Sequence, residues 1–258
     1  MDILANKTRI LDLLSSVNRK GINGLIGWLM YESDFFAAPY STQYHLAVPG
    51  GLAQHSLNVY DLLWQKLIQY TPPLKDQYSL ETAIICGLGH DLCKINFYTR
   101  AVKNVKENGK WHEKEVYVTA DQLPLGHGEK SVSILQDYIH LTDEEKLAIR
   151  WHMCAFDASI HFNYPNGFAY REAVKKSPLV TLLFTADFEA SNIIEAEGQR
   201  WKLPLRSMVN QWLREGRVPL SLTATRLSMT LPKAKAISSI SSWWLRMRCR
   251  VYPCLKDR

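Results

Sequence analysis

The sequence predicts a mainly α-helical protein with a small β-hairpin inserted near residues 96–119. Apolar residues recur at helical spacing along most of the chain before its C-terminal segment. Over 96–119 the pattern changes to short β-prone runs, joined by an Asn108-Gly109 pair that favours a tight turn. A capping-box match from Thr142 to Glu145 marks the start of a later helix.

Each element follows from a local signal. Helical spacing and capping residues predict helices over 7–18, 22–32, 51–70, 79–91, from His127 to about 139, 142–152 and 178–197, and weakly over 200–216. The segment 33–51 is rich in proline, glycine and serine and predicts a loop, and 155–172 is expected to be irregular. We therefore expect N-terminal helices over 1–34, a core domain over 35–199 and a C-terminal extension over 200–258.

Charge is divided unevenly along the chain. Residues 200–258 hold 13 Lys/Arg against 2 Asp/Glu, whereas residues 1–199 hold 18 against 23, so the net charge of +6 comes from the C-terminal segment. A basic pI is therefore no argument that the whole protein binds nucleic acid. The opening residues have no signal-peptide pattern and no run is long enough for a membrane span, so we expect a cytoplasmic protein without membrane contact.

Six polar residues lie at positions where the helical pattern expects burial. His90 and Asp91 are adjacent near the end of an apolar run, and the others come from separate segments: His55, His127, His152 and Asp187. One histidine on an apolar face is usually a satisfied core residue, but a buried unpaired carboxylate is costly. A metal ion explains all six together, because imidazoles and carboxylates are common ligands of divalent ions.

Other residues near these positions are candidates for binding a substrate. Lys94 follows Asp91 by three residues and Lys130 follows His127 by three, so either ammonium group could hold a phosphate oxygen or simply form an ion pair. Two loop residues, His45 and Asp157, could help to place the substrate, although a loop aspartate is more often a turn residue. The five cysteines include no CxxC pair and are expected to be reduced, with Cys86 and Cys93 as small buried residues.

The order of the six residues resembles the HD superfamily of metal-dependent phosphohydrolases. The resemblance spans roughly residues 35–195 and includes the segments APYSTQYHLAVPGGLAQHSLNVY, GLGHDLCK, PLGHGEKSV, IRWHM and LLFTADFEA. It implies a helical bundle in which one metal ion is held by His55, His90, Asp91 and Asp187. It also implies a second ion at His127 and His152, bridged by Asp91, the ions being manganese, iron, magnesium, zinc, cobalt or nickel.

The resemblance implies hydrolysis of a phosphate ester in a nucleotide or short nucleic acid, by a hydroxide shared between two metal ions. Asp91 and Lys94 are then the expected catalytic residues. One alternative is a 3′–5′ exonuclease acting on single-stranded RNA or DNA, with a strand following the basic C-terminal segment and its Trp243 and Trp244. Two others are a nucleotide sensor with little turnover and a purely structural helical protein.

Overall fold

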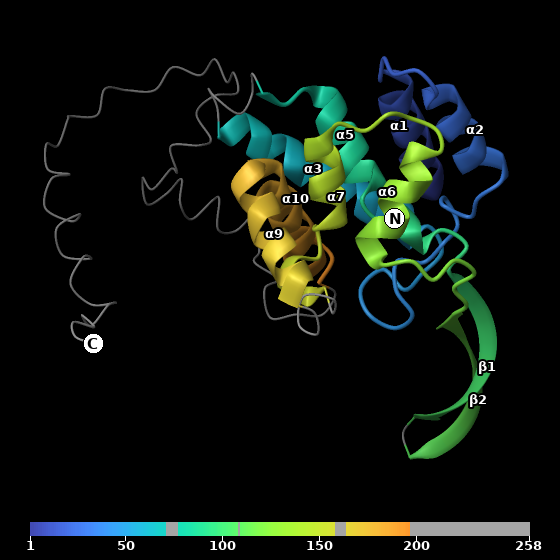
Figure 1. Ribbon diagram of the computed structural model, residues 1–258. Helices are drawn as coiled ribbons and strands as arrows, with labels where there is room; N and C mark the ends of the chain where they lie inside the picture. The colour runs from blue at the N-terminus through green and yellow to red at the C-terminus, as the bar shows by residue number, and fades with distance from the viewer. Residues whose placement is uncertain (71–76, 108, 158–163, 197–258) are drawn as a thin grey trace, which may run out of the picture. The chain divides into compact units, whose positions relative to one another are not determined.

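A computed structural model describes residues 1–70, 77–107, 109–157 and 164–196, all of which belong to the first of two units of the chain, residues 1–202 (Figure 1). Within these residues the protein is mainly α-helical with one two-stranded antiparallel hairpin, as the sequence predicts. No described helix has both the length and the apolar character needed to cross a bilayer.

Two N-terminal helices, α1 (Ile3–Ser15) and α2 (Ile22–Tyr31), pack on the central helices. The side chain of Asp2 caps α1 by accepting a hydrogen bond from the Ala5 N–H at 3.0 Å, so this helix begins earlier than its apolar spacing predicts. Arg19, which lies between the two helices, donates two hydrogen bonds of 2.7 and 2.8 Å to the fully buried carboxylate of Glu145. This pair joins the N-terminal segment to a distant part of the bundle.

The central bundle consists of α3 (Gly51–Gln69), α5 (Leu80–Gly89), α6 (His127–Gln136), α7 (Asp143–Arg150) and α10 (Pro178–Glu189). Helix α3 packs against α5 and α10, α10 packs against α7, and α6 packs against α7 (Figure 1). Side chains such as Leu63, Ile149 and Leu183 are completely buried between them. The predicted capping box is present at Thr142.

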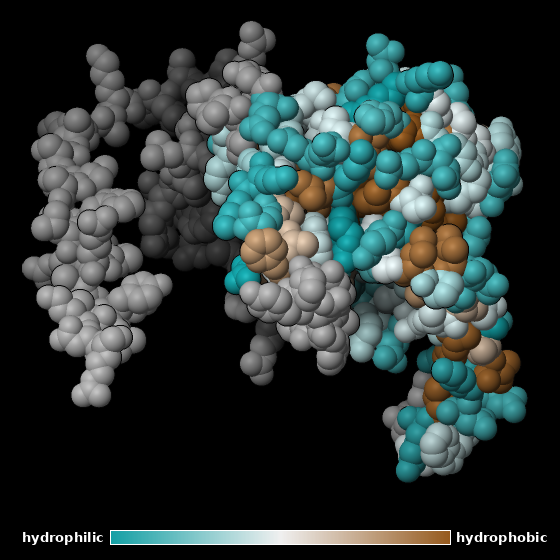
Figure 2. All heavy atoms as spheres, viewed as in Figure 1, coloured by the Kyte–Doolittle hydropathy of each residue, from teal (hydrophilic) through white to brown (hydrophobic). Residues whose placement is uncertain are grey.

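The hairpin is formed by β1 (Tyr98–Glu107) and β2 (Lys110–Thr119), which pair from Tyr98–Thr119 to Glu107–Lys110. Gly109 has a φ of +81°, which suits the glycine of the predicted turn. Figure 1 shows the strands as a curved ribbon, and Figure 2 shows apolar side chains exposed along it. Val102 and Trp111 are each 67% exposed. At the base of the hairpin, the Tyr98 hydroxyl donates a hydrogen bond of 2.9 Å to the Tyr40 carbonyl.

The prediction of an irregular segment over 155–172 is wrong in its second half, where α9 (Tyr164–Lys176) is a helix. Helix α10 begins with Pro178 in its first turn, where proline is favoured, but Ser177 before it makes no side-chain cap. Its hydroxyl instead lies 3.1 Å from the Tyr78 hydroxyl. After Glu189 the chain continues as a π-helical turn, η3 (Ala190–Ile194). The helix predicted over 200–216 lies outside the described residues.

Candidate metal centre

Five segments bring the six predicted ligands to one buried place. His55 lies in the middle of α3, His90 ends α5 and is followed by Asp91, His127 begins α6, His152 follows α7, and Asp187 lies on α10. All except His127 are at least nine-tenths buried. Close approach of the helices makes this convergence possible, because a Cβ on Gly87 of α5 would lie 2.5 Å from the Tyr60 Cα of α3.

The carboxylate of Asp91 lies at the centre of the group, with its two oxygens facing different pairs of histidines. Oδ1 is 2.8 Å from His127 Nε2 and 3.3 Å from His152 Nε2. Oδ2 is 3.5 Å from His90 Nε2 and 3.9 Å from His55 Nε2. Asp91 therefore presents one oxygen to each of two histidine pairs.

The pair formed by His55 and His90 also faces a second carboxylate, that of Asp187. His55 Nε2 lies 3.2 Å from both His90 Nε2 and Asp187 Oδ1. Ligand atoms about 2.0–2.2 Å from one metal ion, at tetrahedral or octahedral angles, are separated by about 3.0–3.5 Å. The separations at this end of the cluster are therefore short enough for one ion to be held there.

The Nδ1 atom of each buried histidine ring already forms a hydrogen bond with an oxygen acceptor. Nδ1 of His90 donates to the Gly87 carbonyl at 2.9 Å, and Nδ1 of His152 donates to the Ile149 carbonyl at 2.7 Å. Such bonds orient metal-binding imidazoles and leave Nε2 as the ligand atom. His152 Nε2 is buried and makes no hydrogen bond, although Asp91 is nearby. A buried polar atom of this kind is costly unless something else binds it.

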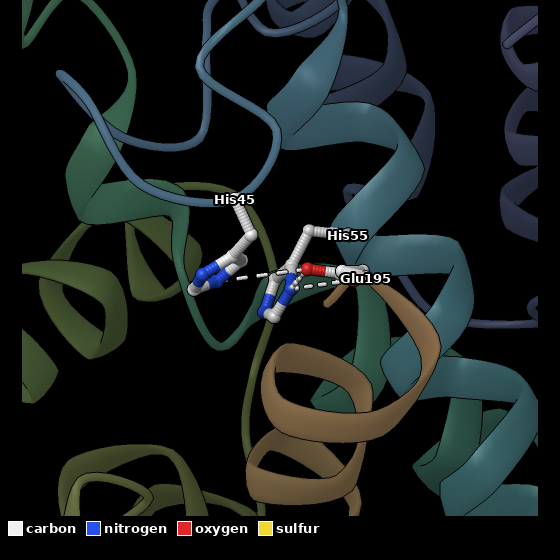
Figure 3. A group of neighbouring side chains, drawn as sticks. All are labelled: His45, His55 and Glu195. Atoms are coloured by element: carbon white, nitrogen blue, oxygen red, sulfur yellow. Dashed lines mark hydrogen bonds and ion pairs between the residues drawn. The ribbon is translucent and has the colours of Figure 1, made fainter. Parts of the chain in front are cut away.

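Glu195 supplies the corresponding acceptor for His55. Its carboxylate oxygens lie 3.0 and 3.1 Å from His55 Nδ1, and one of them accepts a further bond of 2.8 Å from Asn58. His45 approaches the same carboxylate at 3.6 Å, and Figure 3 shows both rings directed toward Glu195. The π-helical turn η3, closed by a bond from the Glu195 N–H to the Ala190 carbonyl, holds Glu195 in this position.

The charges of the cluster are strongly coupled. Burial opposes ionisation of Asp91, but Lys94 and the surrounding imidazoles hold its pKa well below the usual range. Burial also disfavours protonation of His55, yet hydrogen bonds to Asp187 and Glu195 outweigh it and raise its pKa to about 9. Burial lowers the pKa of His90 to about 4. At neutral pH the cluster therefore combines ionised carboxylates with a neutral His90 and a protonated His55.

Three further residues touch the ligands. Lys94 Nζ lies 2.9 Å from Asp91 Oδ2 and 3.4 Å from the centre of the Tyr40 ring. The Tyr40 ring in turn stacks on His55 at 3.7 Å between ring centres. Cys93 is buried, as predicted, and its thiol is also 3.4 Å from His127 Nδ1. Among the described residues, four groups could each hold a metal ion: His55–His90–Asp91, His90–His152–Asp187, Asp91–Cys93–His127 and His45–His55–Glu195.

The predicted substrate-binding residues lie in different surroundings. His45 lines a pocket together with the ligands His152 and Asp187. Lys130 lines a second pocket with Lys94 and His127, but its ammonium group also forms a 2.5 Å ion pair with Asp121. Asp157 instead lies 2.6 Å from an Arg150 guanidinium nitrogen.

The sequence gives no indication of the parts played by Glu195 and Tyr40. Glu195 falls near the predicted end of a helix, and Tyr40 lies in a loop without periodicity. Trp243, Trp244 and the rest of the basic C-terminal segment lie outside the described residues. The chain matches no protein-family model, no curated protein and no solved structure.

Proposed function

We propose that the chain is a metal-dependent phosphohydrolase of the HD type that hydrolyses a phosphate ester of a nucleotide or short nucleic acid. One observation carries the proposal: the two oxygens of Asp91 face two separate histidine pairs. A structural helical protein gains nothing from such a buried arrangement, since each carboxylate taken from water must be compensated. Two divalent ions would compensate the charge and use every inward-facing nitrogen.

The donor set divides between two ions in a consistent way. His55, His90, Asp187 and one Asp91 oxygen would hold the first, and His127, His152 and the other Asp91 oxygen the second. Imidazole and carboxylate ligands suit manganese, iron, zinc, cobalt or nickel, with magnesium favoured only where carboxylate and water dominate. Bound at such a site, divalent ions lower the pKa of water and offset negative charge on a phosphate group.

The residues of the chain itself supply orientation and charge. Among the described lysines, Lys94 is best placed to bind a phosphate oxygen, because its ammonium group reaches the central carboxylate and lines a pocket beside His127. Lys130 is a weaker candidate, because Asp121 already neutralises it. The buried His90 and His152 rings stay fixed by their bonds to backbone carbonyls. This fixed frame is the preorganisation that an electrostatic site requires.

A screen of metals and substrates tests the proposal directly. Protein purified without chelator should contain about two divalent ions per chain. It should hydrolyse at least one member of a panel of nucleoside mono-, di- and triphosphates, cyclic nucleotides and short oligonucleotides, supplied with each metal in turn. Protein that binds metal but hydrolyses none of these compounds would favour the nucleotide sensor. A preference for oligonucleotides over nucleotides would favour the exonuclease. Protein that takes up no metal contradicts the proposal.

Replacing Glu195 with alanine should weaken metal binding without removing any of the six proposed ligands. His55 would lose the acceptor of its Nδ1 proton, so its ring would lose orientation and basicity. Loss of such an orienting partner typically costs about 10–100-fold in metal affinity. Competition with a chromogenic chelator measures the change, and Glu195→Gln, which keeps an acceptor oxygen, should have a smaller effect.

Glu189→Ala provides the matched control for this variant. Glu189 lies at the end of α10 and pairs with Lys66, with its own side chain 38% exposed. Removing this partly exposed ion pair should change stability by about 1 kcal/mol and leave metal affinity unchanged. Equal metal affinity in Glu195→Ala and wild-type protein would show that Glu195 does not orient His55.

A further inference from the structure

Three phenylalanine rings form a continuous surface beside the candidate metal centre. Phe184 and Phe188 lie on α10, on either side of Asp187, and Phe156 ends the 3₁₀ turn η2 (Cys154–Phe156) that follows His152. The Phe156 and Phe188 rings are nearly parallel, 13° apart, with centres separated by 6.0 Å, and Phe184 lies 5.8 Å from Phe188. We call these three rings the aromatic platform.

The platform is open to ligands rather than packed into the core. Phe156 is 63% exposed and Phe188 45% exposed. The rings line a pocket of about 500 Å³ whose walls also include His152 and Asp187. That volume lies within the range of roughly 300–1,000 Å³ typical of small-molecule sites. Any molecule that fills the pocket would therefore touch both the aromatic rings and two of the candidate metal ligands.

A different kind of pocket opens at another part of the same cluster. It has a volume of about 140 Å³ and is lined by His127, Lys94 and Lys130, together with Asp121, the ion-pair partner of Lys130. The pocket on one side of the candidate metal centre is thus lined by aromatic rings, and the pocket on the other side contains the ammonium groups of Lys94 and Lys130. A nucleoside phosphate has the matching asymmetry, with a planar base at one end and an anionic ester at the other.

We propose that the aromatic platform is the subsite for the base of a nucleoside phosphate, whose phosphate group lies at the metal centre. This inference rests on the phosphohydrolase function proposed above and names the part of the substrate that its pocket selects. Bases of every kind have a π-face that stacks on aromatic side chains. Asn192, at the same pocket, donates one N–H to the Phe188 carbonyl at 2.9 Å, and its amide oxygen remains suited to accept from the edge of a base.

Binding of nucleotides and of a base-free counterpart tests the proposal. Calorimetric titration of the full chain with the four common ribonucleoside 5′-monophosphates and with ribose 5-phosphate measures what the base contributes. At least one nucleotide should bind about 10–100-fold more tightly than ribose 5-phosphate. The double variant Phe156→Ala/Phe188→Ala should lose this difference while binding ribose 5-phosphate as the wild-type protein does.

Two further variants separate ring stacking from general effects. Phe156→Leu/Phe188→Leu keeps an apolar surface but lacks the aromatic face, so it should resemble the alanine double variant. Phe168→Ala removes a ring on α9 that is 52% exposed and does not line the pocket, and it should bind nucleotides normally. Equal affinity for nucleotides and ribose 5-phosphate in wild-type protein overturns the proposal. So does a large fall in unfolding temperature of the alanine double variant, since the rings would then pack against the chain itself.

Failure of the proposed base subsite can be told apart from failure of the proposed phosphohydrolase function. Nucleotide preference can be measured without turnover, so its presence in protein that binds no metal would reject the phosphohydrolase proposal alone. Metal-dependent hydrolysis of base-free phosphate esters, without any preference for nucleotides, would reject the aromatic subsite alone.

Discussion

Asp91→Ala should lose bound metal and phosphohydrolase activity together. The side chain is 1% exposed and approaches four histidine nitrogens and the Lys94 ammonium group, so no other single carboxylate among the described residues reaches as much of the cluster. Metal ions contribute several kcal/mol of transition-state stabilisation, and each 1.36 kcal/mol changes a rate about tenfold. We therefore expect kcat/KM to fall by at least about a thousand-fold.

Elemental analysis and turnover of the best substrate from the screen measure both effects on the same preparation. Asp91→Asn is the companion variant, because it keeps the size of the side chain and removes the charge that holds the ions. Asp61→Ala is the control: this aspartate also lies on the bundle, pairs with Arg9 at the surface and is 38% exposed. Full metal content and activity in Asp91→Ala would reject the assignment of the site.

The ligands themselves are predictable because helical periodicity is a strong signal. His55 follows Leu52 by three residues and precedes Val59 by four, and all three are completely buried on α3. Asp187 is recognisable in the same way among the buried residues of α10. Burial of a carboxylate needs a compensating charge, so the pattern indicates a cation as well as a position.

Positions that depend on irregular backbone are not predictable in this way. Glu195 reaches His55 through a π-helical turn, whose extra residue changes the direction of every following side chain relative to an α-helix. Helix α9 begins with Tyr-Pro-Asn-Gly, which resembles a turn, and Ala173 is its only residue described as fully buried. The hairpin is predictable from the sequence, because an Asn-Gly pair favours a two-residue turn, and the strands pair up to Glu107–Lys110 beside it.

Gly87→Ala should destabilise the protein and weaken metal binding, although residue 87 is not a metal ligand. Its added Cβ would lie 2.5 Å from the Tyr60 Cα and 2.9 Å from the Tyr60 N, so α5 and α3 would have to separate. These two helices carry His90 and His55, whose Nε2 atoms are 3.2 Å apart. Overpacking of this kind costs about 1–3 kcal/mol. For a chain of this size, the unfolding temperature should fall by roughly 2–12 °C.

Gly27→Ala separates this steric effect from the intrinsic effect of alanine in a helix. Gly27 lies in α2, and a Cβ there would meet nothing within 4 Å. Because alanine is favoured over glycine inside a helix by about 1 kcal/mol, this variant should unfold at the same temperature as wild type or slightly higher. Thermal unfolding and chelator competition on both variants measure stability and metal affinity. If Gly87→Ala behaved like Gly27→Ala, the close contact of α3 with α5 would not be what holds His55 and His90 at ligand distance.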